Sequence, residues 1–230
     1  GFFYMARGWW YSTNAFDGGV VSVDPSAGDK PAIPRDWLEV VAFATGNADY
    51  LGGYPGVAGV INNKLIYAKG GYTVNTTVPT IRYFDGSGDR ELCTVPPPVA
   101  GGVTQAILSI LVANNTVYFS TFDSGTTSSN WVGRVFELDI TTGASTPLGD
   151  AVFVSGHLPY ALAWYQNKLW VGTNRGDSGA GAGKIYWIRP GVDTAWTNDH
   201  TMTGNQGSVT SLLAFQDNLY VGLMSASTFA

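Results

Sequence analysis

The sequence predicts an all-β protein assembled from repeated four-stranded antiparallel sheets. Three observations support this prediction. One pattern of polar and apolar residues recurs five times along the 230 residues. Most copies place a short polar turn between two apolar runs, which is typical of a hairpin. No segment has the spacing of apolar residues that is typical of a helix.

The repeated pattern is found at residues 6–14, 62–70, 114–122, 166–174 and 216–224, so its copies start 56, 52, 52 and 50 residues apart. An apolar run precedes each of the last four copies. Asn and Asp tolerate positive φ, so Asn-Asn, Gln-Asn or Gln-Asp between two apolar runs predicts a tight turn between a first and a second strand. In the first unit, residues 2–6 are expected to end a first strand.

A third strand is expected at residues 19–26, 80–87, 134–141 and 184–191, and a fourth at residues 37–43, 92–95 and 151–154. Asp24, Asp85 and Asp139 each stand at the end of a third strand. An Asp side chain at this position can accept hydrogen bonds from the backbone of the turn that follows. The fourth unit has Arg189 there instead.

Four strands in every ~50 residues predict the blades of a β-propeller. We expect a single propeller domain over residues 1–230, with units at about 1–45, 46–98, 99–154, 155–205 and 206–230. About 4.5 blades are visible, because the last unit has only its first two strands. We therefore expect the chain to be a fragment of a larger ring, incomplete at the C-terminus.

Residues 62–72 and 83–88 resemble the repeats of Kelch-type and quinoprotein-like propellers, and Gly70-Gly71 is similar to the double glycine of Kelch repeats. At the level of strand pattern, the resemblance covers essentially the whole chain. It implies a β-propeller. The composition is similar to that of propeller modules in phage virions or secreted proteins.

One face of the propeller is expected to carry the long loops, and we call it the loop-rich face. It receives the connections at residues 70–79, 122–133 and 174–183, and the links between units. Loops held on a rigid scaffold often bind ligands, and aromatic side chains can stack on sugars or anchor a protein. The candidate binding residues on this face are Tyr50, Tyr54, Tyr72, Asp123, Trp131, Arg175 and Asp177.

Residues 174–184 have the sequence NRGDSGAGAGK. This segment partly matches three known motifs: a serine protease site, a phosphate-binding loop and a cell-adhesion tripeptide. A serine protease site is excluded, because the order and separation of His, Asp and Ser that a trypsin-like triad needs are absent around Ser178. A phosphate-binding loop is excluded, because Lys184 leads into a strand rather than a helix. Arg175-Gly176-Asp177 is left as a candidate adhesion motif, and the alternative is a soluble loop.

The charge and composition exclude several classes of partner and ligand. The net charge is −5 and only 13% of residues are charged, so we expect no nucleic-acid surface. No apolar run reaches the ~18 residues of a membrane span. Cys93 is the only cysteine, which excludes an internal disulfide. We expect no cofactor and no metal, since His157 and His200 lack clustered ligands.

Asn75 and Asn114 match the acceptor pattern for N-glycosylation. Asn75 is expected in a loop, and Asn114 in a hairpin turn.

Three functional hypotheses follow. The first is a non-enzymatic propeller that recognises a protein or glycan partner through the loop-rich face, at an extracellular or virion surface. The second is a secreted glycan-active enzyme, a hydrolase or lyase with acids at the central channel. The third is a structural subunit whose face is covered by neighbouring chains. Of these, we expect the non-enzymatic propeller.

Overall fold

The structure, a computed structural model, describes residues 3–10, 16–23, 38–42, 57–69, 78–85, 87–97, 103–124, 132–150, 153, 157–175, 182–203 and 206–225. In these residues every regular element is a β-strand. They contain no helix long and apolar enough to cross a membrane. The all-β prediction is confirmed.

The strands of the described residues form five antiparallel sheets. Sheet 1 contains β1 (Phe3–Trp10), β2 (Phe16–Val23) and β3 (Leu38–Ala42). Sheet 2 contains β4 (Val57–Ile61), β5 (Lys64–Lys69), β6 (Thr80–Phe84) and β7 (Asp89–Thr94). Sheet 3 contains β8 (Val103–Ala113), β9 (Thr116–Ser124), β10 (Val132–Leu138) and β11 (Ser145–Pro147). Sheet 4 contains β12 (His157–Tyr165), β13 (Lys168–Arg175), β14 (Lys184–Ile188) and β15 (Thr197–Thr201). Sheet 5 contains β16 (Gln206–Phe215) and β17 (Asn218–Ser225).

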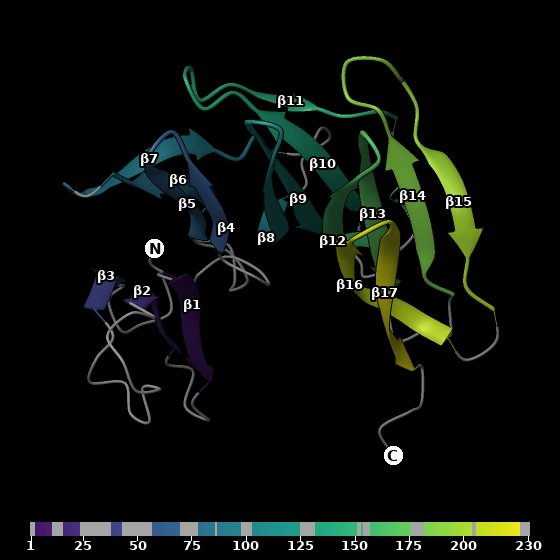
Figure 1. Cartoon of the computed structure of the whole chain (residues 1–230), viewed down its shortest axis with the longest axis horizontal. Helices are drawn as coiled ribbons and strands as arrows, with labels where there is room; N and C mark the ends of the chain where they lie inside the picture. Colours follow the sequence, from purple (N-terminus) through teal and green to yellow (C-terminus); the bar gives the residue numbers. More distant parts are fainter. Residues whose placement is uncertain are drawn as a thin grey trace.

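The five sheets follow one another round an arc, from sheet 1 in purple to sheet 5 in yellow (Figure 1). Consecutive sheets meet at their first strands, because β1 contacts β4, β4 contacts β8, β8 contacts β12 and β12 contacts β16. Four-stranded sheets arranged round a centre with their first strands side by side form a β-propeller. The predicted fold class is therefore confirmed, with sheets 2, 3 and 4 as complete four-stranded blades.

The predicted hairpin turns form where the polar pairs stand. Both turn residues have positive φ in three hairpins: Asn62 and Asn63, Asn114 and Asn115, and Gln166 and Asn167; Gln216 in the last hairpin also has positive φ. Two central residues of positive φ make the turn whose twist matches that of the paired strands. The Asn-rich pairs therefore set the junction between first and second strands.

The Asp-turn prediction is confirmed in two units. The carboxylate of Asp85 accepts a hydrogen bond from the Ser87 backbone N–H at 3.0 Å. The carboxylate of Asp139 accepts one from the Thr141 N–H at 2.7 Å. Asp24 lies outside the described residues. In the fourth unit Asp193 supplies the carboxylate from the other end of the turn, where it accepts the Arg189 N–H at 2.9 Å.

Two expectations about individual strands are wrong. The fourth strand of sheet 3 was expected at residues 151–154, of which only Phe153 is described; the fourth strand in the structure is β11, which pairs Ser145 with Leu138 directly after the Asp139 turn. Phe153 instead fills the core between sheets 3 and 4, with 1% of its surface exposed. Residues 2–6 were expected to end a separate first strand, but the described residues 3–6 do not. The chain has no Asn or Asp pair there, and β1 pairs with β2 without a break from Phe3 to Trp10.

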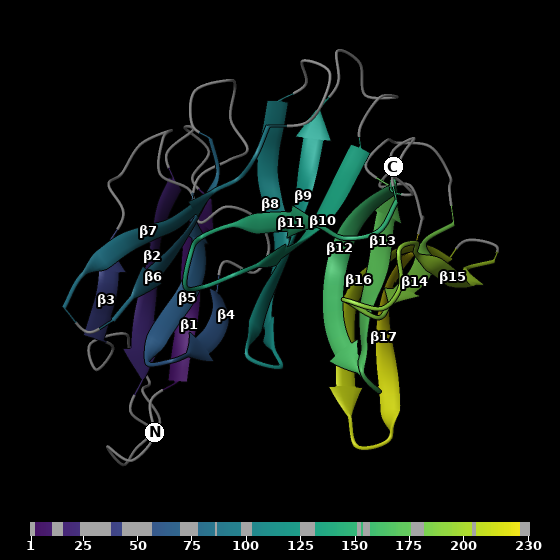
Figure 2. The same cartoon turned by 90° about the horizontal axis from the view of Figure 1, so that it is seen from above.

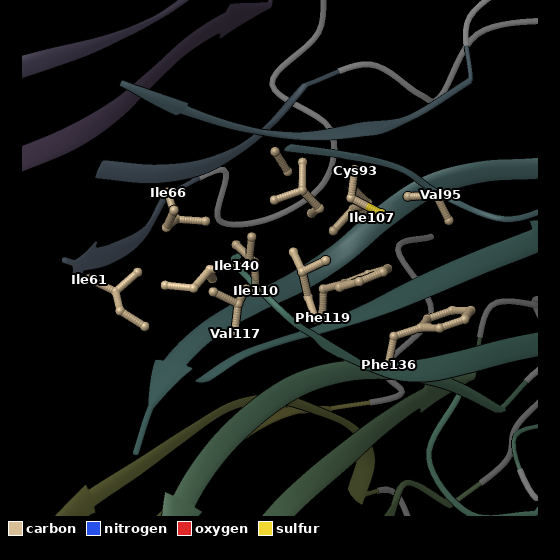
Figure 3. Packing of buried hydrophobic residues seen from close by; sticks show 13 residues of the cluster. Ile61, Ile66, Cys93, Val95, Ile107, Ile110, Val117, Phe119, Phe136 and Ile140 are labelled. Atoms are coloured by element: carbon tan, nitrogen blue, oxygen red, sulfur yellow. The ribbon is translucent and has the colours of Figure 1, made fainter. Parts of the chain in front are cut away.

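The core consists of apolar layers between neighbouring sheets. The layer between sheets 2 and 3 is shown in Figure 3, where Cys93 lies beside Ile107, and Ile66 and Phe119 belong to the same buried cluster. Phe119 stacks on Phe136 with ring centroids 4.8 Å apart. Equivalent layers join sheet 3 to sheet 4 and sheet 4 to sheet 5. Such layers hold the first strands at fixed positions round the centre.

Candidate functional site

One end of the sheets gathers the starts of first strands and the ends of second strands. Val103 at the start of β8 pairs with Ser124 at the end of β9. His157 at the start of β12 pairs with Arg175 at the end of β13. In Figure 2 the tip of β9 points up, while the hairpin between β16 and β17 is at the bottom. The upper end is the loop-rich face of the sequence analysis, and the hairpin turns lie on the opposite face.

An ion pair lies at the base of this face, between β9 and β10. Arg134 Nε donates to Asp123 Oδ2 at 2.6 Å, and Arg134 Nη2 donates to Asp123 Oδ1 at 3.1 Å. Thr121 Oγ1 also donates to Asp123 Oδ2, at 3.2 Å. Only 1% of Asp123 is exposed. A two-point contact of this kind is the strongest form of Arg–carboxylate pairing.

The same guanidinium reaches the connection between sheets 2 and 3. Arg134 Nη2 donates to the carbonyl oxygen of Pro96 at 2.8 Å. The guanidinium carbon lies 4.9 Å from the ring centroid of Phe136. Arg134 therefore joins three segments: the end of β9, the start of β10 and the residues that follow β7.

The structure places Asp123 differently from the sequence analysis, which put it in a loop. It lies inside β9, pairs with Thr104 and Val132, and is buried against Arg134. The sequence did not reveal this burial, because Arg134 lies on the next strand and is separated from Asp123 by a loop. A carboxylate with both oxygens bonded to a guanidinium is poorly placed to exchange protons with a ligand.

The first strands share an irregularity that the sequence did not reveal. The register of β8 with β9 shifts between Ile107 and Ser109, which leaves Leu108 unpaired. The register shifts in the same way between Pro159 and Ala161 of β12, around Tyr160, and between Val209 and Ser211 of β16, around Thr210. Each of these three residues stands six positions before its hairpin turn. A β-bulge redirects side chains and is frequent beside functional sites, so the bulges give sheets 3, 4 and 5 the same irregularity near the centre.

An apolar cluster surrounds two of these bulges. Leu108, Phe122 and Leu158 are buried together, and the partly buried Tyr160 packs against them. Ser120 Oγ donates to the carbonyl oxygen of Pro159 at 2.7 Å. Sheets 3 and 4 are therefore tightly joined near the loop-rich face, which gives any ligand site there a rigid base.

Sheets 4 and 5 are joined at the same height by polar contacts. Ser208 Oγ donates to Asn174 Oδ1. Within sheet 4, the Lys184 backbone N–H donates to Thr173 Oγ1 at 2.9 Å. Thr173 and Ser208 are both buried. Near the loop-rich face, hydroxyl and amide groups therefore lie between sheets 4 and 5. Farther from this face, the layer between the two sheets is apolar.

The first strands of the described part of the chain carry no acidic residue. The sequences of β1, β4, β8, β12 and β16 contain no Asp or Glu. The described residues also contain no group of three or more His, Cys, Asp and Glu that could hold a metal ion. Any acidic group at the loop-rich face must therefore come from residues outside these five strands.

Most of the predicted binding residues lie outside the described residues: Tyr50, Tyr54, Tyr72, Trp131 and Asp177, as well as the glycosylation candidate Asn75. Arg175 is the last residue of β13, at the loop-rich face. Asn114 is exposed in its hairpin turn, with φ of 48°, on the opposite face. The structure thus leaves the binding and glycosylation roles of these residues as predictions.

No known protein family matches the sequence, and no curated protein matches it. Solved structures do share the fold. An exo-β-1,3-galactanase from Clostridium thermocellum is similar with a TM-score of 0.56 and 9% identity, over 92% of this chain and 49% of its own. A glycoside hydrolase family 32 β-fructofuranosidase from Bombyx mori has a TM-score of 0.53 and 12% identity, over 96% and 52%. An α-L-arabinofuranosidase from Lactobacillus brevis has a TM-score of 0.51 and 10% identity, over 96% and 83%.

These similarities define the fold as a β-propeller of the kind found in five-bladed glycoside hydrolases. The chain spans about half the length of the galactanase and of the fructofuranosidase. The β-propeller part of the sequence resemblance is confirmed. Its Kelch-like part and the phage origin find no support, because the similar structures are glycoside hydrolases.

The comparisons also correct one expectation. The sequence analysis favoured a non-enzymatic protein, and this is wrong, because the solved propellers that share the fold are a galactanase, a fructofuranosidase and an arabinofuranosidase. The hypothesis that they favour is the glycan-active enzyme.

Proposed function

We propose that this chain is the propeller of a secreted glycoside hydrolase that binds a glycan at the loop-rich face and hydrolyses a glycosidic bond there. The observation that supports the proposal is the arc of blades. The solved structures that are similar to it include glycosidases of three different specificities. Fold alone does not define chemistry, so the proposal depends on the residues available at this face.

Glycoside hydrolysis needs two carboxyl groups on opposite sides of the scissile bond. One protonates the leaving oxygen, and the other activates water or attacks the sugar. Asp123 is unsuited to either role, since Arg134 bonds both of its oxygens. Two other acids stand in connections that are expected at this face: Asp49, in the link before β4, and Asp177, after β13. We propose these two as the reacting carboxyl groups.

The predicted aromatic residues of the same face fit a glycan ligand. Tyr50, Tyr54, Tyr72 and Trp131 offer flat apolar rings, and sugar rings have apolar faces that stack on such rings. The net charge of −5 and the low charged fraction of 13% favour a neutral ligand over a polyanion. A neutral oligosaccharide is therefore the proposed substrate.

The test is hydrolysis of three probes, β-1,3-galactotriose, an α-L-arabinofuranosyl disaccharide and sucrose, followed by chromatography of the released sugars. Release of sugar from at least one probe is expected. Asp49→Asn and Asp177→Asn should each lower kcat by about 10²–10⁴-fold. Asp217→Asn, in the β16–β17 turn on the opposite face, is the matched control and should leave kcat unchanged. Equal activity in all three variants would exclude the proposed pair of acids.

A further inference from the structure

One contact between neighbouring blades is polar, although the corresponding contact in the preceding pair of blades is apolar. Between sheets 3 and 4, Phe122 of β9 and Leu158 of β12 belong to one buried apolar cluster. Between sheets 4 and 5, Ser208 Oγ of β16 donates a hydrogen bond to Asn174 Oδ1 of β13. The two pairs correspond through the repeat, because Asn174 follows Phe122 by 52 positions and Ser208 follows Leu158 by 50. An apolar pair is therefore compatible with this place in the fold.

The polar pair lies at the end of the blade interface that meets the loop-rich face. Asn174 is the residue before the last of β13, and Ser208 stands near the start of β16. Farther from this face, a Cβ at Gly172 would overlap Val209, and Trp170 belongs to a buried apolar cluster. The interface is thus apolar along most of its length and becomes polar beside the face where a ligand is proposed to bind.

A hydrogen-bonded polar pair stabilises a blade interface less than an apolar pair does. Ser208 is 6% exposed and Asn174 is half-buried. Burial of a hydroxyl and a carboxamide costs free energy that their hydrogen bond largely offsets, whereas burial of Phe122 and Leu158 is favourable in itself. Departures from a locally consistent pattern are expected at functional sites. The polar pair therefore points to a role other than stability.

The hydrogen bond fixes how the Asn174 carboxamide presents its two ends. A carboxamide has an oxygen that accepts hydrogen bonds and a nitrogen that donates two. Because Oδ1 accepts from Ser208 Oγ, the nitrogen Nδ2 lies on the other side of the amide group. Within the described part of the chain, no group accepts a hydrogen bond from Nδ2. The side chain is therefore oriented by one end and can donate to a ligand with the other.

We propose that Asn174 binds the ligand at the loop-rich face, where its Nδ2 donates to a hydroxyl or ring oxygen of a neutral oligosaccharide, and that Ser208 positions the carboxamide for this bond. The inference rests on the proposed function, because it names a residue that contacts the same glycan. A carboxamide carries no charge, which suits a neutral ligand. A few placed polar groups orient a ligand in its site, and a ligand that lacks the matching acceptor leaves such a group unpaired.

Kinetics of the full chain on a hydrolysed probe of the panel test the proposal. In the double variant Asn174→Leu/Ser208→Ala both polar partners become apolar, which can be neutral or stabilising for the fold. We expect KM to rise about ten-fold or more, with most of the loss in kcat/KM carried by KM. Ser208→Ala alone keeps the amide and removes only its positioning bond, so KM should rise less, by about three-fold. Asn198→Leu is the matched control, because Asn198 is exposed on the outermost strand, β15, and should leave KM unchanged.

Urea denaturation of the same variants separates a binding role from a structural one. The proposal predicts that the double variant unfolds at the same urea concentration as the original chain or at a higher one. A KM that stays unchanged in the double variant would overturn the inference while the proposed function stands. If no probe is hydrolysed, the proposed function fails, and calorimetric Kd values for the three probes decide the inference by itself. A Kd raised about ten-fold in the double variant would then support it, and equal values or no binding by the original chain would overturn it.

Discussion

Asp123 is the one carboxylate that is buried among the described residues, and Arg134 compensates its charge. The pair also explains why an acid beside the loop-rich face need not be catalytic. Its carboxylate is held by a guanidinium that is itself bonded to the Pro96 carbonyl oxygen. The interaction therefore belongs to the framework of the site.

Arg134→Met tests this assignment. Removal of the guanidinium leaves the Asp123 carboxylate buried without a counter-charge, which should lower the free energy of unfolding by about 3 kcal/mol or more. Urea denaturation measures the loss. Arg189→Met is the matched control, because Arg189 pairs with the exposed turn residue Asp193 at 2.7 Å, and exposed pairs contribute little. Similar losses in both variants would contradict the framework role.

Tyr118 predicts an alkaline dependence of stability. Burial, followed by the nearby charge of Glu137, raises the pKa of Tyr118 from its ordinary value of 10.0 to about 12. The folded state therefore keeps the phenol neutral at a pH where the unfolded chain ionises. Its contribution to stability is fully present below pH 10 and is lost as the pH rises from about 10 to about 12.

Tyr118→Phe should keep the stacking on Trp164, whose ring centroid is 5.6 Å away, and should remove the ionisable group. Urea unfolding at about pH 9 and about pH 11 is the measurement. We expect the variant to lose less stability over this interval than the original chain. Equal losses would show that Tyr118 ionises at the same pH in the folded and unfolded states.

At the scale of elements, the contact between blades depends on a close approach at Gly172 of β13. A Cβ at Gly172 would overlap Cγ1 of Val209 in β16 and would lie 2.8 Å from its Cβ. The absence of a side chain at Gly172 therefore allows sheet 5 to pack closely against sheet 4. The same approach shows that the blade interface has no room for an added methyl group.

Gly172→Ala should accordingly lower the free energy of unfolding by about 1–3 kcal/mol, the usual cost of overpacking. Gly88→Ala is the control, since a Cβ there meets nothing within 4 Å. Thermal unfolding of the two variants gives the comparison. A loss at Gly88 as large as that at Gly172 would mean that the cost comes from the backbone and not from the blade interface.

The elements that the sequence predicted are those specified by local chemistry. Asn62-Asn63 and Asn114-Asn115 specify hairpins because Asn tolerates positive φ. Asp139 specifies its turn through its carboxylate, which accepts hydrogen bonds from Thr141 and Thr142. By contrast, β15 consists of five exposed residues, TNDHT. A strand without an apolar side has no periodic signal, so the sequence analysis did not predict it.

At the scale of the whole molecule, the repeat predicted the propeller, but the site could not be derived from it. The bulges at Leu108, Tyr160 and Thr210 depend on the register between strands, which no local pattern records. The burial of Asp123 depends on Arg134, which lies across a loop from it. The glycosidase hypothesis was an alternative to the main prediction, because no pair of acids stands out by its spacing.

The most direct test of the account is a crystal structure of the chain with a bound oligosaccharide from the hydrolysis panel. We expect a five-sheet propeller with the sugar at the loop-rich face, beside the starts of β4, β8, β12 and β16. A sugar bound only beside the hairpin turns of the opposite face would contradict the proposed site. Sheets that do not surround a common centre would contradict the fold.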